Sequence, residues 1–308
     1  MGKTFKPSDK EDTKCAPSKK YENNSCFTLE SLKRMATAYN KKIDQKKFSG
    51  KIIDIKDNKT HLVAELTDRL KDICDDQICW LKQDFVKELR NVDIQDKTFR
   101  PVGPQGRFTW LNTTNINEIM SQYEQKHSDF LFLGAVPIDF DSLEDLGIKN
   151  LNFDELVTKG KTKIGIIFNF DEHWKNGSHW VGMYSDLLKN QVYYFDSYGT
   201  RPNKRIRQLV HRISKWCYTR NILKNEEDDI TLSEISFMDT KNPNYIEKKI
   251  KNIKFNQNRH QFKHSECGVY SVNFILRLLK GETFEYICNN VTLDDEVNKC
   301  RETYFRFK

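Results

Sequence analysis

The feature that most constrains the fold is a strongly apolar helix predicted over residues 267–280 (CGVYSVNFILRLLK), which Gly281 ends. A helix with so few polar positions has to be a core helix of its domain. Several apolar runs that precede it are predicted as strands, over 130–136, 164–170, 179–184, 191–196 and 252–256. Because strands follow one another and the core helix comes late, the pattern favours an α+β fold.

The region before this domain is predicted to be helical. Apolar residues recur at helical spacing from Thr28, from Thr60 and over about 75–90. Residues 1–24 are rich in Lys, Ser and Asp, and the segment 100–106 (RPVGPQG) reads as a linker. We therefore divide the chain into a disordered basic tail (1–24), a helical N-terminal arm or docking region (25–98) and a catalytic domain (99–308).

Charge and composition limit the partners and the compartment. The net charge is +7, and the first 50 residues hold twelve Lys or Arg against six Asp or Glu. This basic N-terminus is a candidate for nucleic-acid contact, with a solvated tail as the alternative. No apolar run approaches the roughly 18 residues of a membrane span, and no N-terminal stretch could serve as a signal peptide. We therefore expect no membrane contact, and eight reduced cysteines in an intracellular protein.

The candidate nucleophile is Cys267, at the start of the apolar helix. Unpaired backbone N–H groups and the positive end of the helix dipole stabilise a thiolate there. Gly268 beside it lets a substrate backbone approach closely. A cysteine at a helix start is more often a small buried apolar residue, so the assignment needs a base.

Two His-Trp pairs offer that base, His173-Trp174 and His179-Trp180. His179 opens a predicted strand, whereas His173 lies in a polar loop, so His179 is the expected base. Asp196 ends the next strand and could orient the histidine ring across the two neighbouring strands. Taken alone, Asp196 is better explained as a residue that ends the strand in a turn before Ser197 and Gly199.

The order of these motifs resembles the cysteine proteases that process ubiquitin-like modifiers (the SUMO proteases), with the adenovirus protease and the maturation proteases of large DNA viruses as relatives. The matching elements, over roughly 105–285, are Trp110-Leu111-Asn112, His179-Trp180, Asp196-Ser197, Gln261 and Ser265-Glu266-Cys267-Gly268. The resemblance implies a central mixed β-sheet flanked by helices, with the nucleophile at the N-terminus of the core helix. The chain departs from the family in Glu266, where Asp is more usual, in a longer segment before His179, and in an insertion over 221–251.

The resemblance also implies a mechanism. Cys267 would attack the scissile carbonyl, His179 would protonate the leaving amine, and Asp196 would hold the histidine ring. Gln261 would complete the oxyanion hole with the backbone N–H of Cys267. Trp110 and Trp180 resemble the indoles that flank the substrate tail in this family, where a narrow slot favours Gly-Gly or small-Gly sequences.

Several functions remain in competition. The first is a maturation protease that cuts viral structural polyproteins after Gly-Gly, acting in the host cytoplasm or nucleus and packaged in the virion. The second is a SUMO or ubiquitin-like modifier isopeptidase. The helix–extended–helix pattern over 25–75 also faintly resembles the SAP-type DNA-binding motif, so a DNA-binding module that localises the protease is a further alternative to a helical arm.

We expect neither a metal nor an organic cofactor. His260-x3-His264 before Cys267 and the pair Cys74-x4-Cys79 are the two candidate zinc sites. The first lies in a loop, although its spacing suits a helix, and a zinc ion on Cys267 would quench the nucleophile. The second has the wrong spacing for a zinc knuckle and no histidine nearby.

Overall fold

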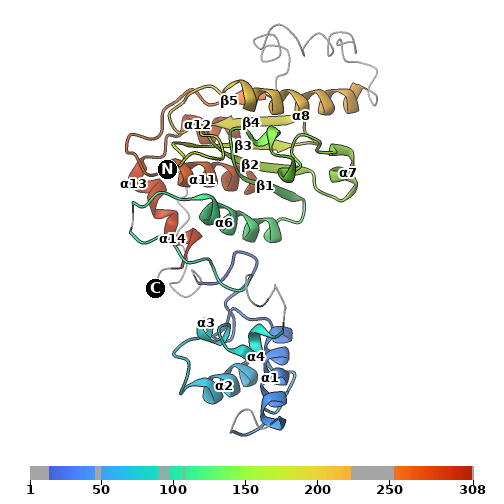
Figure 1. Cartoon of the computed structure of the whole chain (residues 1–308), viewed down its shortest axis with the longest axis vertical. Helices are drawn as coiled ribbons and strands as arrows, with labels where there is room; N and C mark the ends of the chain where they lie inside the picture. The colour runs from blue at the N-terminus through green and yellow to red at the C-terminus, as the bar shows by residue number, and fades with distance from the viewer. Residues whose placement is uncertain are drawn as a thin grey trace. The chain divides into compact units, whose positions relative to one another are not determined.

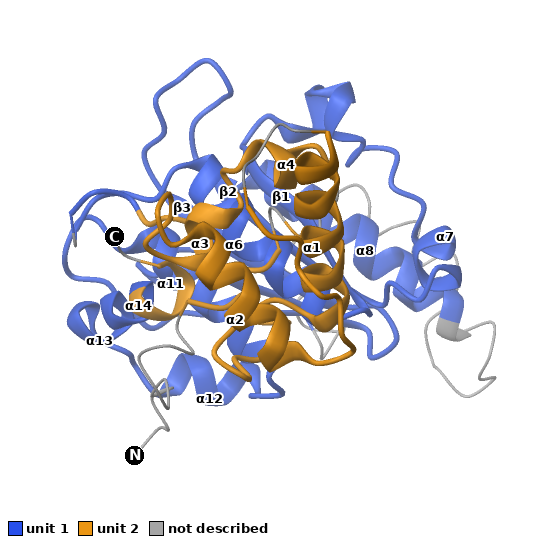
Figure 2. Ribbon diagram, turned by 90° about the horizontal axis from the view of Figure 1, so that it is seen from below, with its two compact units in different colours: residues 1–3, 104–301 blue, residues 4–103, 302–308 orange. Residues whose placement is uncertain are grey.

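The computed structural model describes residues 14–45, 50–89, 94, 97–106, 108–222 and 253–306. These residues form two compact units, 104–301 and 14–103 together with 302–306 (Figure 2). The boundary thus lies inside the predicted linker, five residues after the expected end of the helical region. The last residues belong to the small unit, because the backbone N–H of Arg306 donates to the carbonyl of Pro101. The predicted catalytic domain therefore ends at 301 instead of 308.

The small unit is helical, as expected, but its third helix is not continuous. It contains α1 (Leu29–Asp44), α2 (Lys59–Leu70), α3 (Gln77–Trp80) and α4 (Asp84–Lys87). Thr28 caps α1 with its side chain, and Asn58 caps α2. The helix expected over 75–90 is wrong: the Asp76 side chain caps a new start at α3, and the chain turns again before α4.

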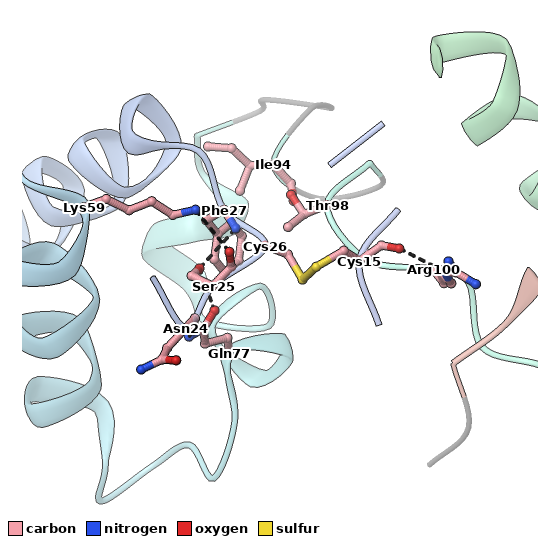
Figure 3. The surroundings of a disulfide bond; sticks show 10 residues. All are labelled: Cys15, Asn24, Ser25, Cys26, Phe27, Lys59, Gln77, Ile94, Thr98 and Arg100. Atoms are coloured by element: carbon pink, nitrogen blue, oxygen red, sulfur yellow. Dashed lines mark hydrogen bonds between the residues drawn. A yellow bond between two sulfur atoms is a disulfide. The ribbon is translucent and has the colours of Figure 1, made fainter. Parts of the chain in front are cut away.

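Two disulfide bonds lie in the small unit, Cys15–Cys26 and Cys74–Cys79. Cys15 and Ala16 are each 1 % exposed, and the Cys15 carbonyl accepts a hydrogen bond from Arg100 (Figure 3). The disordered tail expected over 1–24 is therefore wrong for residues 14–24, whereas residues 1–13 lie outside the described residues. The expectation of eight reduced thiols is wrong for these four, because the fold brings the two sulfur atoms of each pair within bonding distance.

The larger unit, residues 104–301, is built on a mixed five-stranded sheet, which confirms the predicted α+β class (Figure 1). Its strands are adjacent in chain order: β1 (Phe130–Pro137), β2 (Lys163–Asn169), β3 (Trp180–Asp186), β4 (Gln191–Phe195) and β5 (Ile253–Phe255). The central pairs β2–β3 and β3–β4 are antiparallel, and the outer pairs β1–β2 and β4–β5 are parallel.

Helices cover both faces of this sheet. The apolar helix α11 (Cys267–Leu279) packs on β3 beside α6 (Thr113–Lys126), and α8 (Lys204–Ile222) packs on the opposite face (Figure 1). Gly182 in β3 allows the close approach of α11, because a Cβ atom there would lie 3.2 Å from the carbonyl oxygen of Ser271. The apolar helix is thus the core helix that the sequence predicts.

Shorter elements complete the unit. After β1 come the 3₁₀ turns η1 (Phe140–Ser142) and η2 (Glu144–Leu146) and the helix α7 (Phe153–Thr158); after α11 come α12 (Phe284–Asn289) and α13 (Asp294–Lys299). The last helix, α14 (Arg301–Tyr304), starts at the final residue of this unit and otherwise belongs to the small unit. The predicted 221–251 insertion falls almost wholly outside the described residues. None of the helices in the described ranges is long and apolar enough to cross a membrane.

Candidate active site

Cys267 is the first residue of α11, and only 2 % of its surface is exposed. The unpaired N–H groups of the first helical turn and the positive end of the helix dipole lie beside its sulfur atom. One turn later, the Ser271 hydroxyl donates to the Cys267 carbonyl at 2.9 Å. The backbone that positions Cys267 is therefore fixed at the start of the helix.

His179 and Asp196 meet at the ends of two neighbouring inner strands of the sheet. His179 directly precedes β3 and Asp196 directly follows β4, and these strands are antiparallel neighbours. The start of one strand and the end of the other therefore lie side by side. His179 Nε2 is 2.6 Å from Asp196 Oδ1, and both side chains are buried. The two residues thus form the hydrogen-bonded pair that the sequence predicts.

The position of Asp196 is set by its backbone as well as its side chain. Asn256 makes two hydrogen bonds to it: Asn256 Oδ1 accepts from the Asp196 N–H at 2.8 Å, and Asn256 Nδ2 donates to the Asp196 carbonyl at 2.7 Å. The N–H of Tyr198 also donates to Asp196 Oδ1 at 2.9 Å. Because the carboxylate oxygen that holds His179 receives a second donor, its orientation is fixed.

The environment of His179 favours the charged imidazolium. Burial lowers the pKa of His179, but hydrogen bonds and charge attraction from Asp196 and Cys267 outweigh that effect and raise the pKa to about 9. The side chain of Cys267 therefore lies near enough to the ring to help raise its pKa. The charged imidazolium is the favoured form of His179 at neutral pH.

Two aromatic rings confine His179. The Tyr198 ring stacks on it with centroids 4.7 Å apart and an interplanar angle of 20°, and the Phe170 ring meets it edge-on at 5.2 Å. These contacts restrict rotation of the imidazole about its hydrogen bonds. The imidazole is therefore held in its position between Asp196 and Cys267.

Gln261 is fully buried in the loop that leads to α11. Its Oε1 accepts from the Ser197 hydroxyl at 2.6 Å, and its Nε2 donates to the Lys263 carbonyl at 2.8 Å. The Gln261 backbone N–H also donates to the Ser197 carbonyl. Because Ser197 fixes the oxygen side of the amide, Nε2 keeps one N–H for another acceptor.

Trp180 and Gly268 pack together beside the nucleophile. A Cβ atom on Gly268 would lie 3.1 Å from Leu111 Cβ and 3.3 Å from Trp180 Cδ1. Trp180 is buried and donates from Nε1 to the Leu111 carbonyl at 2.8 Å, whereas Trp110 is 44 % exposed. The segment with Trp110 therefore lies next to the start of α11, and substrate contact by either indole stays a prediction.

The second histidine candidate has a different partner. His173 Nδ1 is 2.7 Å from Asp139 Oδ2, and its backbone N–H donates to Asp139 Oδ1. Its side chain is half exposed. His173 is thus better held than its polar loop suggested, but its carboxylate partner is Asp139 and not Asp196.

Three contributions to the site were not predicted: the side chain of Asn256, the hydroxyl of Ser197 and the ring of Tyr198. Ser197 and Tyr198 directly follow Asp196, so their nearness to the site could be predicted from the sequence. Their contacts with Gln261 and His179 could not. Asn256 follows the insertion, and no motif there marks it. The two zinc candidates take other bonds: Cys74 and Cys79 are joined to each other, and the buried His260 accepts from the N–H of Thr292 through Nδ1.

The sequence of this chain is similar to those of known proteins. Residues 157–305 match the model of the Ulp1 protease family, C-terminal catalytic domain. A viral protein named "Putative thiol protease", from Acanthamoeba polyphaga mimivirus, is 37 % identical over 298 residues, which cover 92 % of this chain and 90 % of the relative. The match therefore spans both units and not only the catalytic one.

More distant relatives agree with this result. The SUMO-1 cysteine protease of African swine fever virus is 22 % identical over 254 residues, or 76 % of this chain and 83 % of the relative. A crystal structure of the African swine fever virus protease superposes with a TM-score of 0.56 at 19 % identity, covering 96 % of each chain. The structural match shows a shared fold.

Proposed function

The chain belongs to the Ulp1 protease family and is a cysteine protease, and from this premise we propose that Cys267, His179 and Asp196 are its catalytic triad. The observation that carries the proposal is the buried His179–Asp196 pair, 2.6 Å apart, whose histidine also interacts with Cys267 at the start of α11. The raised pKa of His179 favours the charged imidazolium at neutral pH, which is the proton donor that the leaving amine needs.

The steps follow from these positions. The Cys267 thiolate attacks the scissile carbonyl carbon, and the imidazolium of His179 gives its proton to the leaving amine, which departs. Water then attacks the thioester, with neutral His179 accepting its proton, and the acid product and the resting ion pair are formed. Asp196 stabilises the positive charge on the ring throughout.

Gln261 is the side-chain donor of the proposed oxyanion hole. Its Nε2 has an N–H that neither Ser197 nor the Lys263 carbonyl uses, and the backbone N–H of Cys267 supplies the second donor. Removing one such donor costs roughly 100- to 1000-fold in kcat. We therefore expect a loss of that order for Gln261→Ala, with the substrate KM changed much less.

The triad is tested with a peptide aldehyde or vinyl sulfone probe and mass spectrometry of the labelled chain. We expect label on Cys267 in the full chain and none in Cys267→Ala, and we expect His179→Ala to abolish peptide hydrolysis. His173→Ala is the matched control, because it removes the other His-Asp pair and leaves activity intact. Loss of activity in His173→Ala and its retention in His179→Ala would reverse the assignment of the base.

The proposed substrates carry Gly-Gly or a small residue followed by Gly before the cleaved bond. Support comes from the close packing of Gly268, Leu111 and Trp180 beside the nucleophile, which leaves little room for substrate side chains. Peptides with Leu in place of either Gly should be cut at least tenfold more slowly. Equal rates for the Gly and Leu peptides would remove this part of the proposal.

We propose maturation of viral structural polyproteins as the physiological role, because the 37 % identical relative is a viral protein matched along nearly its whole length. Removal of a ubiquitin-like modifier is the second candidate, favoured by the name of the African swine fever virus relative. A SUMO or ubiquitin probe with an electrophilic C-terminus separates them. Labelling of Cys267 by it favours the modifier protease, and cleavage of Gly-Gly peptides without such labelling favours maturation.

A further inference from the structure

A continuous stack of rings and one guanidinium group runs outward from the His179 ring. Tyr198 stacks on His179, the Arg259 guanidinium lies 5.1 Å from the Tyr198 ring, and the Phe262 ring covers the same guanidinium at 5.0 Å. Tyr198 is half-buried, whereas Arg259 and Phe262 are exposed. The stack therefore connects the proposed base to the protein surface.

Arg259 is held in one orientation within this stack. Its Nε donates to the Gln261 carbonyl at 2.7 Å, and the rings of Tyr198 and Phe262 both contact its guanidinium group. The backbone beside it is fixed as well, since the N–H groups of His260 and Gln261 both donate to the Ser197 carbonyl. An arginine held in this way loses little entropy when its terminal N–H groups bind an acceptor.

The charge of Arg259 is not neutralised within the described part of the chain. None of the acidic residues described there forms an ion pair with Arg259. The two terminal nitrogens of its guanidinium group have no hydrogen-bond partner among the described residues. Two neighbouring acids are occupied elsewhere: Asp294 accepts from the N–H groups of Phe262 and Lys263, and Asp295 pairs with the Lys263 ammonium at 2.6 Å. Arg259 is thus a positioned cation that forms no ion pair with the residues that the structure describes.

The stack begins on the leaving-group side of the site. His179 gives its proton to the amine of the residue that follows the cleaved bond, so that residue and its successors pass next to the histidine. The acyl side instead lies against Gly268, Leu111 and Trp180. Side chains that follow the cleaved bond therefore come closest to Tyr198, Arg259 and Phe262.

We propose that Arg259, framed by Tyr198 and Phe262, is a specificity subsite that binds an acidic side chain within the first three residues after the cleaved bond. This inference rests on the proposed triad, because it uses the position of the leaving amine at His179. The planar guanidinium presents paired N–H groups that match a carboxylate, and the flanking rings exclude water from its faces. Since Arg259 is exposed, we expect a preference of about 2- to 5-fold over the uncharged amide analogue.

The test is a peptide library with mixed residues on both sides of the cleaved bond, digested by the full chain and read by mass spectrometry. Residues before the bond report on the Gly-Gly proposal, and residues after it report on Arg259, so the two can fail separately. We expect Asp and Glu to be enriched at one of the first three positions after the bond. Matched Glu and Gln peptides then give the ratio of kcat/KM at that position.

Arg259→Met removes the charge and keeps an apolar stem between the rings, so the Glu/Gln ratio should fall to near one. Measuring a ratio within each variant cancels any general loss of activity. Lys263→Met is the matched control, because it removes a nearby cation that Asp295 already neutralises, and its ratio should equal that of the unmodified chain. Raising the salt concentration from 50 to 500 mM should reduce the ratio of the unmodified chain, because the Debye length shortens.

Three results would overturn the subsite. They are no acidic enrichment after the bond, acidic enrichment only before it, and an unchanged Glu/Gln ratio in Arg259→Met. Acidic enrichment after the bond without Gly-Gly before it supports the subsite and contradicts the proposed Gly-Gly specificity. A library that is cut at no sequence overturns both.

Discussion

Replacing Asp196 with Asn is the most informative single change, because it removes a charge while keeping the shape of the side chain. The hydrogen bonds from Asn256 to the Asp196 backbone do not depend on the carboxylate, so they hold the residue in place. The shift of the His179 pKa from 6.5 to about 9 corresponds to about 3 kcal/mol in favour of the imidazolium. Asp196 is the leading group among those that raise it.

The sign of the pH effect follows from this shift. A raised pKa keeps His179 protonated at neutral pH, and the ion pair is lost as the pH rises through about 9. Without the carboxylate, burial still lowers the pKa and Cys267 alone opposes it. The basic limb of the pH profile should therefore move down by roughly one to two units, and kcat/KM at pH 8 should fall roughly 10- to 100-fold.

The assay is peptide hydrolysis, with kcat/KM measured from pH 5 to 10 for the unmodified chain and the variant. Asp139→Asn is the matched control, since it alters the carboxylate of the other His-Asp pair, and it should leave both limbs in place. A basic limb that stays near pH 9 in Asp196→Asn would refute the reasoning, because the carboxylate would then have no part in holding the imidazolium.

Three other changes test separate parts of the structure. Ser197→Ala frees the Gln261 amide to rotate, so kcat should fall about tenfold while iodoacetamide still alkylates the thiol at the usual rate; parallel losses in both assays would contradict this. Gly182→Ala places a methyl group 3.2 Å from the Ser271 carbonyl oxygen, and urea denaturation should show a loss of about 1–3 kcal/mol, which an unchanged midpoint would disprove. Cys26→Ser opens an 11-residue disulfide loop and should destabilise the small unit by about 2–3 kcal/mol, measured by hydrogen exchange of its helices; equal exchange with and without the bond would argue against it.

The catalytic unit was predictable because its signals are local and periodic. Alternating and continuous apolar runs mark the strands, and the core helix is marked by apolar residues at nearly every position. The order of His179, Asp196 and Cys267 could be recognised because each stands at the end of such an element. The antiparallel pairing of β3 and β4, which follow each other in the chain, then brings His179 and Asp196 together.

The small unit was harder to predict because long-range contacts decide its structure. Cys15 is buried by residues near 26 and 98–100, so a local sequence rich in Lys and Ser misleads. The break between α3 and α4 depends on a cap from Asp76, a residue that equally suits an exposed helix surface. The return of residues 302–306 to this unit depends on backbone pairing with Pro101, which leaves no pattern in the side chains.

The position of the insertion explains how the site tolerates it. The chain leaves α8 at Ile222 and returns at β5, where Val192 of β4 pairs with Ile253. The pairing of β4 with β5 sets which residues of the two strands lie opposite each other. Asn256, directly after β5, therefore reaches the Asp196 backbone whatever segment lies between residues 222 and 253. From Asn256 the chain needs only five residues to place Gln261 on Ser197. The geometry of the base and of the oxyanion donor is therefore fixed by β5 and the turn after β4, and the inserted segment can vary without moving either one.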